Sequence, residues 1–416
     1  MADGAITQTA LDHARSVPLD EIDVSHPDLW SNDSHWPYFE RLRKEEPIHW
    51  AETEQDWGNY WSVTRWNDIM AVDTDHEAFS SEPTIVLPDP AEDFTLPMFI
   101  AMDPPKHDVQ RKTVSPAVSP HSLALQEPQI RQWAGDILDG LPIGEEFDWV
   151  DKVSMELTAM MLANLFGAPQ EDRRKLTYWS DVATAIPGGG LIDTIQQKVE
   201  IFTQYHSYFT QLWNQRVNAE PTNDLISMLA HGESTRNMEP REFFGNVVLL
   251  TVGGNDTTRN TISGSVLALN QNPDQYQKLR DNPELIPNMV SETIRWQTPL
   301  AHMRRIAKQD IEFGGKTIRE GDKVVMWYVS GNRDETVIDN PNAYLIERDR
   351  ARQHLSFGFG IHRCVGNRLA ELQLKIIWEE ILKRFPEVKV VGEPKRSYST
   401  FVKGYERLPV VIPSRI

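Results

Sequence analysis

The sequence predicts a mainly α-helical fold with a minor β part, folded as one large domain. Apolar residues recur at helical spacing along most of the chain, over residues 149–166, 195–217, 240–269, 285–297 and 365–385. Alternating patterns typical of strands occur only in short stretches, within residues 48–64 and 303–329. No linker rich in glycine, serine or proline divides the 416 residues. We therefore expect a single domain over residues 31–416, preceded by a loose N-terminal arm over residues 1–30.

The first elements after the arm are expected to be a helix, a hairpin and a long loop. Ser34 is a residue type that caps helices, and the helix that it would cap runs past Leu42. Residues 48–53 and 60–64 alternate on either side of a glycine-containing turn, which predicts a β-hairpin. Residues 82–105 combine prolines with apolar side chains, so we expect an irregular loop packed on the domain.

The later elements are expected to be helices and short strands joined by glycine-containing turns. Gly188-Gly189-Gly190 lies between two helical segments, where it either permits hinge motion or forms a merely flexible loop. Gly314-Gly315 predicts a turn within the strands of residues 303–329. The last helix, residues 365–385, carries an apolar stripe that predicts one buried face.

The composition excludes several classes of partner. The chain has 42 Lys and Arg against 61 Asp and Glu, for a formal net charge of −19, which argues against nucleic acid or an anionic membrane surface as the main partner. Hydrophobic residues make up 40% of the chain, which is ample for a large core. The beginning of the chain has no apolar signal region, and no apolar run is long enough to span a membrane. We expect a cytoplasmic protein.

Cys364 is the only cysteine in the chain, so it cannot form an internal disulfide. It is therefore a buried thiol, a nucleophile or a metal ligand, and a lone cysteine is most often an inert small hydrophobe. Its neighbours favour a ligand. Glycines in residues 357–366 allow tight turns, and a helix that begins at Val365 would put its positive end beside the sulfur. His362 and Arg363 add nearby cations that favour a thiolate.

The pattern Phe357-x-x-Gly360-x-His362-x-Cys364-x-Gly366 resembles the haem-binding loop of the cytochrome P450 family. The resemblance covers nearly the whole chain and implies the cytochrome P450 fold with haem b, iron protoporphyrin IX, as cofactor. It implies Cys364 as the iron ligand, and Phe357, His362 and Gly366 as further cofactor-binding residues. The family usually has arginine where His362 stands, and a histidine can still donate to a haem propionate.

A second motif lies in the helix of residues 240–269. Gly253-Gly254-Asn255-Asp256-Thr257 consists of poor helix formers, and each glycine costs about 1 kcal/mol relative to alanine. The Thr257 hydroxyl can bond to the Gly253 carbonyl and open the helix locally, although a glycine pair alone is explained as well by helix packing. The motif resembles the P450 oxygen-activation motif, which implies that Asp256 and Thr257 are catalytic residues that organise water and protons.

Further charged residues match the family's pattern. Glu292 and Arg295 are three residues apart on one helical face, a spacing that alone is weak evidence. Their position before Cys364 resembles the family's Glu-x-x-Arg, which implies a structural trio completed by Arg348, with Arg350 as the alternative third member.

Three more cations are assigned to the haem propionates. His107 and Arg111 are four residues apart, so they share a helical face, and Arg305 follows Arg304 in a predicted strand. Charged donors form strong pairs with carboxylates. The family resemblance implies that these three residues bind the cofactor.

The resemblance implies a haem-thiolate monooxygenase that inserts one oxygen atom from O2 into a C–H bond. The chain has no flavin or nicotinamide fingerprint and no cysteines for an iron–sulfur cluster, so we expect a separate ferredoxin and ferredoxin reductase as electron donors. Basic residues would suit an acidic ferredoxin or would neutralise haem carboxylates: Lys106, Arg111, Lys112, Arg363, Arg368 and Lys375. The alternatives are a peroxide-using variant and a non-catalytic haem or apolar-ligand sensor, and the Asp256-Thr257 pair argues against both.

The substrate is expected to be a medium-chain alkane or fatty acid attacked at its terminal carbon. The residues of both motifs resemble those of the bacterial P450 subfamily of alkane and fatty-acid terminal hydroxylases. Relatives of that subfamily accept terpenes and other small apolar molecules, and such a molecule is the alternative substrate. An apolar pocket is expected from Val86, Leu87, Met98, Phe99, Ile186, Leu250, Gly253, Leu300, Ala301, Met303 and Phe401.

Overall fold

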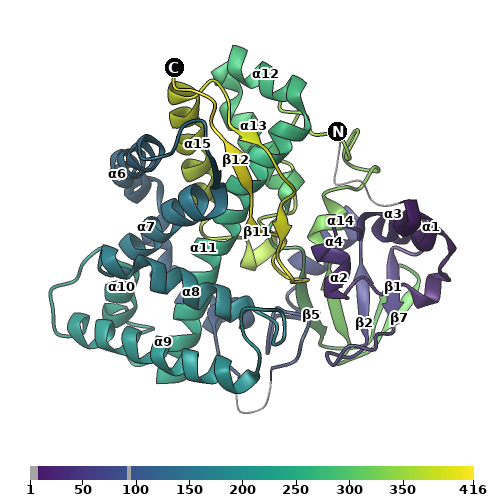
Figure 1. The fold of residues 1–416 in the computed structure, drawn as a ribbon. Helices are drawn as coiled ribbons and strands as arrows, with labels where there is room; N and C mark the ends of the chain where they lie inside the picture. The colour runs from purple at the N-terminus through teal and green to yellow at the C-terminus, as the bar shows by residue number, and fades with distance from the viewer. Residues whose placement is uncertain (1–7, 91–94) are drawn as a thin grey trace.

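The computed structural model describes residues 8–90 and 95–416 and confirms the mainly helical class (Figure 1). Helices fill one side of the molecule, and the largest sheet lies on the other side with the N-terminal segments. The α-helices of the described residues are α1 Gln8–Ser16, α2 Pro27–Ser31, α3 Trp36–Glu45, α4 Trp66–Thr74, α5 Lys106–Val114, α6 Pro120–Asp139, α7 Met155–Phe166, α8 Arg173–Thr184, α9 Ile195–Arg216, α10 Leu225–His231, α11 Pro240–Gln271, α12 Pro273–Asp281, α13 Ile286–Gln297, α14 Tyr328–Gly331 and α15 Asn367–Arg384.

The strands are short and form a five-stranded sheet and three smaller sheets. They are β1 Ile48–Ala51, β2 Tyr60–Val63, β3 Phe79–Ser80, β4 Glu146–Asp148, β5 Met303–Ala307, β6 Ile311–Phe313, β7 Lys316–Ile318, β8 Lys323–Met326, β9 Lys389–Val390, β10 Lys395–Arg396, β11 Tyr405–Arg407 and β12 Pro409–Val411. The large sheet has the order β1-β2-β8-β5-β3, in which only β2 and β8 are parallel. The small sheets pair β4-β12-β9, β10-β11 and β6-β7. The hairpin of β1 and β2 and the turn at Gly314-Gly315 are as predicted.

Helix α11 is the central element of the helical side, where α7, α8, α13 and α15 pack against it. Its side chains are buried along most of its length, including Val247, Ile262 and Val266. Helix α15 buries the predicted stripe through Leu369 and Ile377. Because both helices are apolar on the faces that meet the core, the periodicity of the sequence was sufficient to predict them.

The N-terminal arm differs from its prediction. Residues 1–7 lie outside the described residues, but residues 8–30 contain α1 and α2 and are packed on the domain. Ile22, Val24 and Trp30 are buried in a cluster that includes Trp327 from beyond β8. The arm is ordered because its few apolar side chains cover an apolar face that would otherwise be exposed to water.

The start of α3 differs in detail from expectation, and the glycine loop contains a hydrogen-bonded turn. His35, not Ser34, precedes the first turn of α3, and the Ser34 hydroxyl donates to the Leu29 carbonyl oxygen instead (3.3 Å). Between α8 and α9, the Gly188 N–H donates to the Ile192 carbonyl oxygen (2.8 Å), and Ile192 is buried. The loop after α8 is therefore attached to the domain through the buried Ile192 side chain. No helix of the described residues has the length and apolar character needed to cross a bilayer.

Candidate active site

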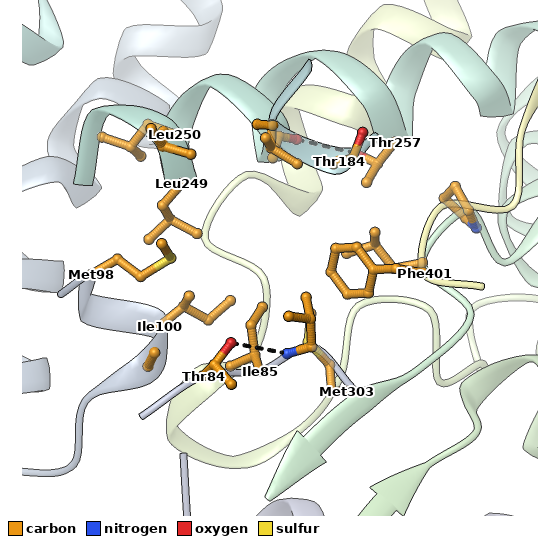
Figure 2. Close-up of a pocket in the computed structure, with 18 of the residues that line it drawn as sticks. Thr84, Ile85, Met98, Ile100, Thr184, Leu249, Leu250, Thr257, Met303 and Phe401 are labelled. Atoms are coloured by element: carbon orange, nitrogen blue, oxygen red, sulfur yellow. Dashed lines mark hydrogen bonds between the residues drawn. The ribbon is translucent and has the colours of Figure 1, made fainter. Parts of the chain in front are cut away.

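A cavity of about 810 Å³ lies between the helical side and the large sheet. Its walls come from residues 83–101, the end of α8 with the start of α9, the middle of α11, residues 299–305, residues 356–374 and residues 399–401. Figure 2 shows Leu249 and Leu250 on α11 facing Met98 and Ile100, with Phe401 reaching in from the C-terminal part of the chain. The wall is mainly apolar, so the cavity favours apolar ligands.

The Cys364 segment reaches this cavity through two tight turns. Gly358 and Gly360 both have φ of 63°, a left-handed backbone conformation that residues other than glycine rarely adopt. The Cys364 N–H donates to the Phe357 carbonyl oxygen (2.8 Å), which closes the loop. The buried Asp73 accepts from the Phe359 N–H (2.8 Å) and so fixes the loop against α4. Sequence reasoning missed Asp73, because it lies far from the loop in the chain.

The Cys364 side chain is exposed to the cavity. Desolvation raises the pKa of this thiol, while hydrogen bonds from the backbone N–H groups of Gly366 and Asn367, and the charges of Arg111 and Arg363, act in the opposite direction. Beside the sulfur, a Cβ at Gly366 would meet open space. The segment therefore presents a thiol, N–H donors and room for a large group on the same side.

Two buried histidines near the cavity have unused ring nitrogens. The rings of His107 and His362 are 4.2 Å apart, and within the described parts of the chain the His107 Nε2 and both His362 nitrogens have no hydrogen-bond partner. Burial lowers the pKa of both rings. Arg111 donates to the Arg363 carbonyl oxygen, and Arg305 pairs with Asp73 (2.8 Å) while lining the cavity. The four residues assigned to the propionates, His107, Arg111, Arg305 and His362, thus lie close together beside the cavity.

These residues fit haem b. A cavity-facing thiol suits a metal ligand, and the open space beside Gly366 suits a flat cofactor. Unpartnered ring nitrogens of buried histidines need acceptors, which the two propionates would supply. Arg111 and Arg305 add charged donors to the same region.

The motif on α11 is divided between the cavity and the core. The Thr257 hydroxyl donates to the Gly253 carbonyl oxygen (3.1 Å), as predicted, and both residues line the cavity. The helix is continuous from Pro240 to Gln271, so the hydroxyl bond does not interrupt it. A Cβ at Gly253 would meet nothing, whereas one at Gly254 would lie 3.2 Å from Leu162 of α7. One glycine keeps the cavity open, and the other allows close helix packing.

Asp256 faces away from the cavity into a buried polar network. Its carboxylate accepts from Ser180 (2.9 Å) and from the Asn255 side-chain amide (2.8 Å), and it lies 3.3 Å from Arg259. Burial raises the pKa of Asp256 to about 6, against the opposing effect of Arg259. Thr184 lines the cavity, and its hydroxyl oxygen lies 3.4 Å from Oδ2 of Asp256. Asp256 therefore reaches the cavity only through other hydroxyl groups.

The network around Asp256 extends toward the surface. Arg259 also pairs with Asp181 (2.7 Å), a partly exposed residue on α8. Sequence reasoning missed Ser180, Thr184 and Arg259, since the first two lie on another helix. Arg259 could have been found, because it lies three residues after Asp256 on the same helical face.

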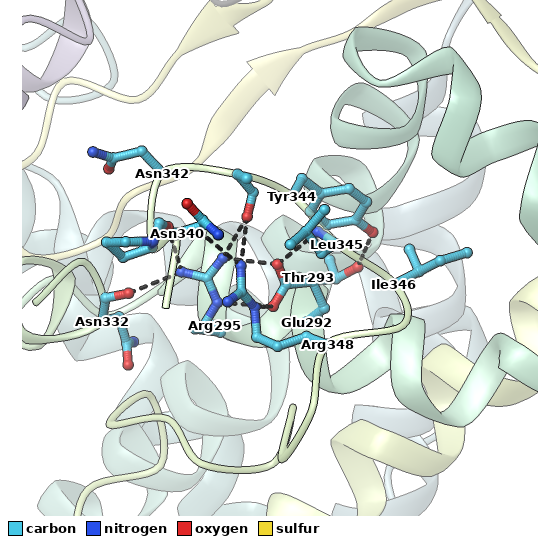
Figure 3. Close-up of polar contacts among 12 residues, drawn as sticks. Glu292, Thr293, Arg295, Asn332, Asn340, Asn342, Tyr344, Leu345, Ile346 and Arg348 are labelled. Carbon is cyan, nitrogen blue, oxygen red and sulfur yellow. Dashed lines mark hydrogen bonds and ion pairs between the residues drawn. The ribbon is translucent and has the colours of Figure 1, made fainter. Parts of the chain in front are cut away.

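Glu292, Arg295 and Arg348 form the predicted trio (Figure 3). Arg295 donates to both Glu292 oxygens (2.8 Å each), and Arg348 Nε donates to Glu292 Oε2 (2.9 Å). Arg348, and not Arg350, is therefore the third member. The guanidinium of Arg295 also donates to the carbonyl oxygens of Asn332 and Pro341 (2.9 Å each). The trio thus fastens residues 332–348 to α13.

The predicted pocket residues line the cavity with two exceptions. The residues that line it are Val86, Met98, Phe99, Ile186, Leu250, Gly253, Leu300, Met303 and Phe401. Leu87 and Ala301 were wrong predictions, because both are fully buried in the cluster around Trp327. Each directly follows a residue that lines the cavity, but its own side chain packs into this cluster instead.

Lys198 of α9 also lines the cavity and was missed by sequence reasoning. It lies four and seven residues before Phe202 and Tyr205, which are buried on the inner face of α9. A lysine on the apolar stripe of a helix is the signal that could have identified it.

The comparisons with known proteins agree with this geometry. The family model described as cytochrome P450 matches residues 144–407. The linalool 8-monooxygenase of Pseudomonas putida is 35% identical over 408 residues, which cover 95% of this chain and 99% of that protein. A methyl-branched lipid omega-hydroxylase of Mycobacterium tuberculosis is 31% identical over 413 residues, 95% of either chain.

Solved structures give the same result. A cytochrome P450-153 from Novosphingobium aromaticivorans superposes with a TM-score of 0.87 at 46% identity, over 94% of this chain and 99% of that one. The chain belongs to the cytochrome P450 family and is a monooxygenase with haem b as its cofactor.

Proposed function

We propose that this monooxygenase hydroxylates medium-chain alkanes or fatty acids at or near the terminal carbon. The observation that carries the proposal is the apolar cavity that extends to Cys364. Leu249, Leu250, Met303 and Phe401 supply large apolar walls, and burying a hydrocarbon there is favourable by about 25 cal/mol per Å² of apolar surface.

Selectivity for the chain end has to come from the walls. A terminal C–H bond is stronger than the internal ones, so unguided attack would favour internal carbons. Leu300 and Phe401 are bulky residues of the wall, and they would restrict which carbon reaches the reactive centre. Support also comes from the names of similar proteins, since one is an omega-hydroxylase of methyl-branched lipids.

A terpene or another small apolar molecule is the second candidate substrate. The observation that favours it is the 35% identity to a linalool 8-monooxygenase over nearly the whole chain. The same apolar walls would accept such a molecule. The two candidates are separated by product analysis, since they share the same chemistry.

In the proposed mechanism, haem supplies the iron chemistry that activates dioxygen when it is bound. Cys364 would ligate the iron, while His107, His362, Arg111 and Arg305 would hold the propionates. One oxygen atom enters the C–H bond and the other leaves as water, which consumes two electrons and two protons.

The protons would reach the cavity through this chain's own hydroxyl groups. Asp256, whose burial raises its pKa to about 6, can hold a proton near neutral pH. The hydroxyl of Thr184 lies 3.4 Å from its carboxylate and lines the cavity together with Thr257. Thr257 would position water at the cavity end of this route. Arg259 and Asp181 connect the other end of the route to solvent.

The electrons would come from a ferredoxin and its reductase. Lys112, Arg363 and Arg368 are exposed near the start of α15 and around α5, although the net charge is −19. Lys106 instead pairs with Glu242 (2.6 Å). The smaller set of exposed cations would still attract an acidic partner.

The experiment supplies decane, decanoic acid and linalool to the haem-loaded enzyme with a surrogate ferredoxin and reductase. The alcohols are identified by gas chromatography. Terminal alcohols of the linear substrates support the proposal, whereas mainly internal alcohols contradict the terminal position. If linalool alone is oxidised, the terpene candidate replaces the linear one.

A further inference from the structure

Lys198 occupies an unusual position in the cavity wall. Its ammonium group donates to the carbonyl oxygens of Ala183 (2.9 Å) and Ala185 (3.1 Å) at the end of α8. The side chain is half-buried, and Nζ lies 5.9 Å from the centre of the Phe202 ring. An ammonium group has three N–H donors, and these two carbonyls use two of them.

No carboxylate of the described residues pairs with this ammonium group, whereas two other charged residues of the cavity wall, Arg305 and Asp89, have ion-pair partners. Arg305 pairs with Asp73 (2.8 Å), and Asp89 pairs with Arg304 (2.7 Å) and Lys323 (2.6 Å). Burial lowers the pKa of Lys198 to about 8, so the group is largely charged at neutral pH. A charged group that is partly desolvated and lacks a counter-ion is costly.

Capping of α8 accounts for part of this arrangement. A lysine at a helix C-terminus satisfies free carbonyls and interacts favourably with the helix dipole. Capping does not require the lysine to lie on the inner stripe of α9, where Phe202 and Tyr205 are buried. A surface lysine would cap α8 equally well without the cost of desolvation.

We propose that Lys198 anchors the carboxylate of a chain-shaped substrate, so that fatty acids are the substrate class of this site. The inference rests on the proposed function and narrows it. A bound carboxylate would supply the missing counter-ion and take up the remaining N–H donor.

The anchor also determines which end of the substrate reacts. Lys198 comes from α9, which packs on α8, α10 and α11, whereas Cys364 comes from the segment before α15. The cavity wall also includes Leu249, Leu250 and Phe401, beside which a carboxylate would be buried without partners. The carboxylate therefore stays at Lys198, and the hydrocarbon end extends along the apolar wall. A fixed anchor further predicts a chain-length optimum for acids.

The test compares decanoic acid with its uncharged methyl ester on the haem-loaded enzyme. Binding is measured by titration calorimetry and by the substrate-induced shift in haem absorption. Lys198→Met is expected to weaken binding of the acid by roughly 10- to 100-fold, as for the loss of a charge-assisted hydrogen bond, and of the ester by less than about threefold. Lys198→Arg should retain most of the affinity for the acid. Lys175→Met, an exposed lysine on α8, is the matched control and should change neither affinity.

Selective loss of acid binding in Lys198→Met, with a broadened chain-length profile of terminal hydroxylation, supports the anchor. Equal weakening of acid and ester overturns it and leaves Lys198 as a cap of α8, while the proposed function stands. If the wild-type enzyme binds neither acid, ester nor decane, the proposed function itself fails, and the inference fails with it.

Discussion

Replacement of Arg295 by methionine is expected to destabilise the enzyme more than any exposed ion pair can. Arg295 and Glu292 are both fully buried, and the guanidinium makes five hydrogen bonds, two to Glu292 and three to the backbone carbonyls of Asn332, Pro341 and Ala343. Methionine fills much of the same space but cannot donate. The substitution therefore leaves buried acceptors without their donor.

The size of the effect follows from what remains. Glu292 keeps the Arg348 guanidinium (2.9 Å) and the Leu345 N–H (2.9 Å), and Ala343 also keeps Arg348 (2.7 Å). The buried Glu292 carboxylate thus keeps two hydrogen-bond donors, which limits the loss of free energy of unfolding. Breaking a buried pair costs about 3–5 kcal/mol, and we expect a value toward the lower end. The segment of residues 332–348 should loosen first, because three of the five bonds end there.

The assay is urea unfolding of the haem-loaded protein, followed in parallel by far-ultraviolet circular dichroism and by haem absorbance. The matched control is Arg407→Met, which removes an exposed pair with Glu146 (2.8 Å) and should cost less than about 1 kcal/mol. The double variant Glu292→Gln/Arg295→Met should lose less than the sum of the single variants, because the two side chains act together. If Arg295→Met and Arg407→Met have the same free energy of unfolding, the reasoning about burial is wrong.

Four further outcomes are expected. Cys364→Ala should abolish turnover and the red-shifted Soret band of the reduced, carbon monoxide-bound enzyme, and a retained band would refute thiolate ligation. Thr257→Ala should leave substrate binding nearly unchanged but lower the product formed per reduced cofactor consumed; an unchanged ratio would remove Thr257 from the mechanism. Arg111→Ala should weaken haem binding by about 1.5–3 kcal/mol, measured as haem retained on a desalting column, and full retention would exclude a role in holding a propionate. Burial lowers the pKa of Lys403 from 10.5 to about 7. Between these two pH values the unfolded chain binds more protons than the folded protein, so the free energy of unfolding should rise with pH. Lys403→Met should reduce this rise, measured by urea unfolding at several pH values, and an unchanged rise would exclude Lys403 as its source.

The parts of the molecule that the sequence predicted well are those that depend on neighbours in the chain. Helix α11 and helix α15 have apolar stripes that are visible in the sequence, and the hydrogen bond from Thr257 to Gly253 spans a single helical turn. The turns at Gly358 and Gly360 were predicted for the same reason, since a left-handed residue is a local requirement. The Ser34 prediction failed because several residue types can precede a helix, and tertiary contacts decide which residue takes that position.

The groups that the sequence did not predict come from distant segments. Asp73 accepts from the Phe359 N–H and pairs with Arg305. More than half of the chain separates Asp73 from each of these two partners. Thr184 meets Asp256 only because α8 packs across α11. No spacing rule connects such residues, since their contact is a result of the fold.

The pocket residues show one kind of error that depends on packing and one omission that helical spacing could have avoided. Val86 and Leu300 line the cavity, while Leu87 and Ala301 are buried in the cluster around Trp327. Lys198 could have been found from the sequence, because its helical spacing from Phe202 puts it on the inner face of α9. A charged side chain at an inward position forms an ion pair, loses its charge through a shifted pKa, or binds a ligand. Because the described residues offer Lys198 no carboxylate, we propose that the substrate supplies its counter-ion, which makes the cavity a binding site for an acid with a long apolar tail.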